Sequence, residues 1–110
     1  MMTFNKFNAC PVAVPFSGQY DAFQNAINFS WGEASILRKE QLGIRLLVEI
    51  LSDENSRTSI YLESTATRHV FHVPVLCRVY YAFLTAYSPK EVIPQTAITN
   101  LANPFGMLIP

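Results

Sequence analysis

Histidine and cysteine are the side chains of this chain with the widest metal-binding and catalytic chemistry, and the sequence has two of each. His69 and His72 lie three residues apart in a segment that we predict to be a strand. Because successive side chains of a strand point to opposite faces of the sheet, these two imidazoles could not bind one metal ion together. Cys10 and Cys77 lack the close spacing of a zinc site, so we expect reduced, buried thiols. The sequence therefore predicts no metal site.

The sequence motifs of common enzyme classes are missing as well. The four glycines are spread singly and cannot form a phosphate-binding loop, and no serine lies in a Gly-x-Ser-x-Gly motif. Glu49 and Glu63 could face each other across a hairpin. Solvated carboxylates without a catalytic role are often arranged in the same way. A small enzyme that uses Glu63 with His69 or His72 is an alternative that no spacing supports. We therefore expect neither an enzyme nor a cofactor.

Aromatic side chains are more numerous than a few strands need for cohesion. We expect most of them to lie in the core and the remainder to line a groove for apolar segments of another chain. Tyr61 is the best groove candidate, because its position in the alternation is opposite to that of Ile60 and Leu62. Of the four predicted client-binding residues, Phe71 fits a core position best. The four are Tyr61, Phe71, Tyr80 and Tyr81.

These side chains must be positioned by the elements around one long hairpin. Apolar residues occupy every second position over 42–51, as in a half-buried strand. A polar turn follows, and the chain returns over 57–73 through β-branched and aromatic residues. A helix over 39–51 is the competing interpretation, because leucine and isoleucine also recur there every four residues. The predicted strands are 11–16, 25–37, 41–51 and 57–73, the last with a bulge around 66–68.

The period of the apolar residues changes after Pro74 from two to about 3.6, which predicts a helix over 75–86. Ser88, Pro89 and Glu91 have the capping pattern of a helix start, which predicts a longer helix over 89–102. The expected fold class is therefore α+β. It would consist of a four-stranded antiparallel sheet followed by a crossover segment and a long C-terminal helix.

Composition sets the remaining expectations. At 110 residues the chain, 1–110, is expected to form one domain. Half of its residues are hydrophobic and only 15% are charged, so we expect a homo-oligomer that covers apolar surface. Eight basic residues balance eight acidic ones, which gives no field to attract nucleic acid. The first residues lack the pattern of a signal peptide, and no apolar run is long enough to cross a membrane, so a cytoplasmic location is expected.

Three segments carry a resemblance to the SecB export chaperones. Ala86-Tyr87-Ser88-Pro89, followed by Pro94, resembles the segment that opens the long first helix of that family. Ile60-Tyr61-Leu62-Glu63 and Val70-Phe71-His72-Val73 are similar to one of its strands. The resemblance covers roughly Cys10 to Pro110.

The resemblance implies an ATP-independent chaperone that holds unfolded preproteins in apolar grooves and assembles as a dimer of dimers. It also implies docking to the SecA motor, in which Glu63 matches one carboxylate of the acidic docking face. The neutral charge, and Pro11 and Pro15 where the family carries acids, depart from that pattern. The rival hypothesis is a small interaction protein, such as an immunity protein, an antitoxin or a phage-encoded inhibitor, that binds one folded partner.

Overall fold

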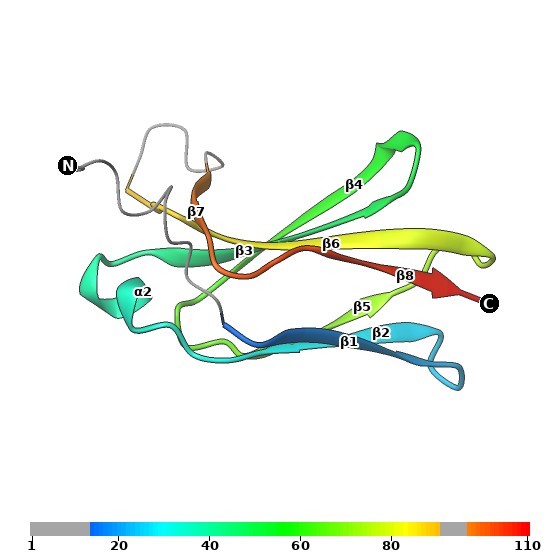
Figure 1. Cartoon of the computed structure of the whole chain (residues 1–110), viewed down its shortest axis with the longest axis horizontal. Helices are drawn as coiled ribbons and strands as arrows, with labels where there is room; N and C mark the ends of the chain where they lie inside the picture. The colour runs from blue at the N-terminus through cyan, green and yellow to red at the C-terminus, as the bar shows by residue number, and fades with distance from the viewer. Residues whose placement is uncertain (1–13, 91–96) are drawn as a thin grey trace.

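The computed structural model describes residues 14–90 and 97–110. Over these residues the chain forms an all-β sandwich of two antiparallel sheets (Figure 1). The smaller sheet has the strand order β1-β2-β5, and the larger sheet has the order β4-β3-β6-β7, with β8 also paired to β6. In chain order the elements are β1 (Phe16–Asp21), β2 (Ala26–Trp31), α2 (Ser35–Lys39), β3 (Gly43–Ile50), β4 (Asp53–Leu62), β5 (Arg68–His72), β6 (Arg78–Tyr87), β7 (Ala97–Asn100) and β8 (Phe105–Ile109).

The core lies between the two sheets and is built from the inward positions of alternating strands. Along β3 these positions are fully buried, and along β6 every second residue is buried in the same way. The smaller sheet contributes β2, whose inward aromatic and aliphatic side chains face the larger sheet. The largest fully buried side chains are Phe29, Ile27, Leu37, Ile44, Leu46, Leu84, Leu101, Ile109 and Val48.

The predicted hairpin is confirmed, and the competing helix over 39–51 is wrong. β3 pairs antiparallel with β4 in a register that sets Leu46 opposite Ile60. The connection is shorter than expected: Ile50 already pairs with Asp53, and Ser52 turns the chain with a positive φ of 66°. Alternation of apolar residues therefore located this hairpin correctly, but the polar residues after Asp53 extend the strand instead of forming a loop.

The α+β fold class is wrong, because the segments predicted as helices are strands. β6 occupies most of 75–86, and β7 occupies 97–100 within the predicted helix over 89–102, of which 91–96 lie outside the described residues. Residues 89 and 90 form a turn. β6 is a central strand with neighbours on both edges, so apolar side chains on both of its faces obscured the two-residue period. The long helix implied by the SecB resemblance is not formed at its predicted start.

Two other strand predictions need correction. The strand predicted over 25–37 ends at Trp31, and the short helix α2 follows. The strand predicted over 57–73 is two strands in different sheets, because the chain crosses from β4 to β5 between residues 63 and 67. Of the strand predicted over 11–16, residues 11–13 lie outside the described residues, and β1 begins at Phe16.

Candidate functional site

The outer face of the larger sheet carries a group of aromatic and aliphatic side chains. The backbone register sets Leu47 opposite Phe83, and both alternate with buried neighbours, so their side chains point away from the core. Tyr81 and Tyr87 extend the same row along β6, and Tyr61 adds to it from β4. We call these five residues, Leu47, Tyr61, Tyr81, Phe83 and Tyr87, the outer aromatic face. All are partly exposed, whereas the alternate positions of β6 are buried.

Two glycines make room for tyrosine rings on this face. Gly43 pairs with Tyr87, and a Cβ at Gly43 would lie 2.6 Å from Cε1 of that ring. Gly106 pairs with Tyr81, and a Cβ there would lie 2.8 Å from Cε1 of the tyrosine. Each ring therefore lies across the neighbouring strand at a position where a side chain would displace it.

A groove opens at the end of the larger sheet next to α2, and we call it the end groove. Its volume is about 620 Å³, and its lining includes Tyr61 and Tyr87, with Glu63 and Arg38 as the charged residues. The two tyrosine rings meet edge to face, with centroids 5.0 Å apart and planes at 75°. This volume lies within the roughly 300–1,000 Å³ that binding pockets for small molecules usually have, and it would admit a few apolar side chains of a partner.

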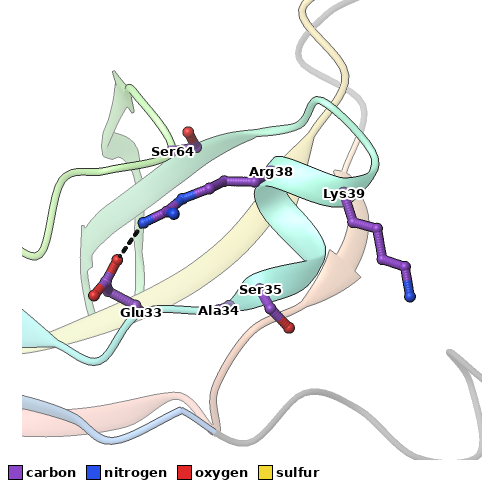
Figure 2. A pocket seen from close by; sticks show the side chains of 6 residues that line it. All are labelled: Glu33, Ala34, Ser35, Arg38, Lys39 and Ser64. Carbon is purple, nitrogen blue, oxygen red and sulfur yellow. Dashed lines mark hydrogen bonds and ion pairs between the residues drawn. The ribbon is translucent and has the colours of Figure 1, made fainter.

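A second, more polar pocket of about 720 Å³ lies beside the end groove and shares Arg38 and Ser64 with it. Figure 2 shows the Arg38 guanidinium directed toward Glu33, and a nitrogen of the arginine lies 2.8 Å from a carboxylate oxygen. Lys39 extends away from this pair (Figure 2). Both partners of the ion pair are about two-thirds exposed, so it contributes little to stability. We find here a solvated rim to the groove and no catalytic arrangement of side chains.

The histidines and the described cysteine do not form a site. His69 and His72 lie on opposite faces of β5, and His72 is exposed. Partial burial, with a smaller effect of the neighbouring His72 charge, lowers the pKa of His69 from its ordinary value of 6.5. Cys77 is free and exposed, which corrects the expectation of a buried thiol, while Cys10 lies outside the described residues. Over 14–90 and 97–110, no three His, Cys, Asp or Glu side chains gather around a possible metal position.

The predicted client-binding residues separate into two pairs. Tyr61 is 39% exposed on the outer aromatic face, and Tyr81 is half-buried on the same face. Phe71 and Tyr80 instead lie in the core, where they are 8% and 2% exposed and their ring centroids are 6.1 Å apart. The Tyr80 hydroxyl donates a hydrogen bond of 2.7 Å to the carbonyl of Val75 and accepts one of 3.2 Å from its N–H. These two aromatics are therefore structural.

Glu63, the residue predicted to dock a partner, is exposed and lies at the rim of the end groove beside Tyr61. The prediction did not name Phe83 and Tyr87 as client-binding residues, because it assigned a helical period of about 3.6 to this part of the chain. Tyr81, Phe83 and Tyr87 are two and four residues apart on β6 and therefore share one face of the strand, but the apolar residues between them hide this spacing in the sequence.

The fold and this face define the class of the molecule: a β-sandwich with an aromatic outer face on its larger sheet. No protein-family model matches the chain. No curated protein matches it either. Among solved structures, a β-sandwich protein from a computer-based redesign is similar, with a TM-score of 0.55 and 13% sequence identity over 90% of this chain and 94% of that one. At this identity the likeness concerns the fold alone.

Within the described part of the chain, no helix is long and apolar enough to span a bilayer.

Proposed function

We propose that this chain is a protein-binding module whose end groove and outer aromatic face take apolar side chains of one protein partner. The observation that carries the proposal is the edge-to-face pair of Tyr61 and Tyr87 at the mouth of the groove. Tyrosine supplies a large contact area at a small cost in conformational entropy, and it is enriched among the residues that dominate binding energy. A solvated sheet face normally carries polar side chains instead.

One ion pair on this face neutralises two of its charges, so packing would contribute more than net charge to the selection of the partner. Arg57 Nε lies 2.9 Å from a carboxylate oxygen of Glu49, and both residues lie on the outer side of the larger sheet. An aromatic centre with charged residues around it is the usual composition of a specific interface. This arrangement supports the small interaction protein, such as an immunity protein, an antitoxin or an inhibitor.

A displayed library of random linear peptides tests this proposal, because it measures whether the groove accepts apolar side chains. Peptides enriched on the full chain should be rich in aromatic and aliphatic residues. Replacing both Tyr61 and Tyr87 by alanine should weaken their binding about tenfold or more, as expected for the loss of a central aromatic anchor. The control is Phe23→Ala, which removes a fully exposed aromatic ring in the turn between β1 and β2. If the peptides bind the double variant and the wild type equally, the proposal is wrong.

A chaperone that holds unfolded chains without ATP is the second candidate, and the far end of the sandwich favours it. Phe23 is 103% exposed there, and Leu51, Val75 and Leu76 are exposed in the neighbouring connections. The turn containing Phe23 adjoins the start of the β5–β6 connection, since the Val73 N–H donates to the Asn25 carbonyl at 2.9 Å. A holdase needs several apolar contact areas, whereas a module for one partner needs one.

Suppression of aggregation distinguishes the two candidates. A holdase should keep an unrelated unfolded protein soluble at stoichiometric amounts without ATP, and Phe23→Ser should reduce this effect. A module for one partner should leave the aggregation rate unchanged. The replacement of Phe23 is a suitable probe, because a fully exposed side chain contributes little to the folded state.

A further inference from the structure

The strand β4 is a long open edge of the larger sheet. Among the described elements it pairs with β3 alone, and it runs for 10 residues. The other edge strands are shorter: β1 has 6 residues, β5 has 5, β7 has 4 and β8 has 5. Figure 1 shows β4 at the free side of the larger sheet, rising away from β5. An open edge presents a row of unpaired backbone donors and acceptors, which a further strand can satisfy.

Two of the usual protections of such an edge, proline and lysine, are missing from β4, DENSRTSIYL, and its charged residues all lie in its first half. Its register irregularity against β3 falls near the turn, between Val48 and Ile50, so the part of β4 from Thr58 to Leu62 pairs regularly. The backbone of this half is therefore extended and ready for pairing on its free side.

We propose that a second copy of this chain pairs with β4 edge to edge, antiparallel, about a two-fold axis at Ser59. The two larger sheets would then form one continuous sheet. The proposal is independent of the proposed function, since two chains can pair through β4 whether or not the outer aromatic face binds a partner.

Symmetry and charge restrict the position of the axis and favour Ser59 among the positions from Ser56 to Ser59. A two-fold axis perpendicular to the sheet keeps every side chain on its own face, so the axis must pass through a residue position and cannot fall between two. An axis at Arg57 sets two guanidinium groups opposite each other, and an axis at Thr58 brings Asp53 opposite Glu63 of the other copy. Like charges in opposite positions are destabilising. An axis at Ser56 avoids this repulsion, but it leaves the apolar end of the strand, Ile60 to Leu62, unpaired.

The axis at Ser59 brings together side chains that fit. Arg57 of one copy then lies opposite Tyr61 of the other, a pair that can form a cation–π contact. Thr58 lies opposite Ile60, a partly buried residue on the inner side. The Glu49–Arg57 pair of each chain remains on the outer side, so the charge of Arg57 stays paired at the seam.

Two properties favour a second copy over a peptide of another protein. The chain has eight basic and eight acidic residues, so two copies do not repel each other at long range. The strand is also complementary to itself in the register at Ser59, whereas nothing on its edge selects a foreign sequence. The outer aromatic faces of both copies would lie on the same side of the joined sheet, because the axis is perpendicular to it.

Sedimentation of the full chain with one matched pair of variants tests the proposal. The wild type should be dimeric at about 100 μM, and Ser59→Lys, which sets two lysines opposite each other at the axis, should raise the dimer Kd about tenfold or more. The control is Ser17→Lys, the same exposed replacement on β1, the edge of the smaller sheet. It should leave the dimer Kd unchanged. A wild type that is monomeric at this concentration, or a dimer that is weakened by Ser17→Lys alone, overturns the proposal.

Cysteine cross-linking tests the register. In a background with Cys10 and Cys77 replaced by serine, Ser59→Cys should form a disulfide-linked dimer under mild oxidation. Directly opposite residues have Cα atoms about 4.5–5.5 Å apart, within the range of a disulfide. Thr58→Cys is the control, because two copies of residue 58 would be displaced along the strands and should cross-link at least about tenfold more slowly. Equal rates at both positions would contradict an axis at Ser59.

Discussion

Gly43→Ala offers the sharpest test of how the outer aromatic face is packed. The new Cβ would lie 2.6 Å from Cε1 and 2.8 Å from Cζ of Tyr87, where ordinary contacts begin at 3.4 Å. The ring must therefore move by about 1 Å or swing into solvent, which disturbs its contact with Tyr61. The backbone itself accepts alanine, because no described glycine has a positive φ. The cost of this substitution therefore comes from the ring.

The magnitude follows from three contributions. Crowding of a packed position costs about 1–3 kcal/mol, and loss of an edge-to-face aromatic pair costs about 0.5–1.5 kcal/mol. Replacing glycine by alanine within a strand returns about 0.5–1 kcal/mol. These terms overlap, since a ring that swings away loses its pair but relieves the crowding. We therefore expect Gly43→Ala to lower the free energy of unfolding by about 1–2 kcal/mol.

The sign of the effect should reverse once the ring is removed. In a Tyr87→Ala background the crowding and the aromatic pair are both absent, so Gly43→Ala should stabilise the chain by about 0.5–1 kcal/mol. Urea unfolding followed by the fluorescence of Trp31, the single tryptophan and a buried one, measures all four free energies of the cycle. If Gly43→Ala destabilises both backgrounds equally, the Tyr87 ring does not lie over Gly43.

Three further predictions use the same unfolding assay. Tyr61→Ala should cost about 1–2 kcal/mol, since its ring is partly exposed, whereas Phe71→Ala in the core should cost about 3–5 kcal/mol; equal costs would contradict their placement. Tyr80→Phe should cost about 1–3 kcal/mol, because it removes both hydrogen bonds between the hydroxyl and the Val75 backbone, and an unchanged urea midpoint would argue against these hydrogen bonds. The lowered pKa of His69 means that the unfolded chain binds its proton more readily, so stability should fall as the pH drops below 6.5. His69→Gln should flatten this dependence, and an identical pH profile would show that another group causes it.

Local pattern was sufficient for the central hairpin. The predicted strand has an apolar face, formed by Leu42, Ile44, Leu46, Val48 and Ile50, and a mixed face. A strand with these two faces needs only a neighbouring strand and a core on its apolar side. The same parity argument placed Tyr61 on the face opposite to Ile60 and Leu62, where the structure has it. Residue spacing was therefore sufficient to place one residue of the candidate site, Tyr61.

The rest of the candidate site depended on which strands become neighbours. β6 lies between β3 on one side and β7 and β8 on the other, so its inward row meets the core while Tyr81, Phe83 and Tyr87 cover the outer face. A run that is apolar on both faces has no two-residue period, and sequence alone cannot distinguish it from a buried helix. The assignment of Phe71 and Tyr80 to the core likewise required β5 and β6 to lie in different sheets that face each other.

The sequence by itself determined the half-buried strands β3 and β2, because one solvated face and one buried face leave an alternating pattern in the residues. Tertiary structure alone decided the fold class and the end groove. The groove exists because the ends of β3, β4 and β6 meet the segment after α2, and residues from 37 to 89 come together there through pairings that no local pattern encodes. Long-range pairing supplies the free energy that makes β6 a strand, and it also brings Tyr87 against Tyr61.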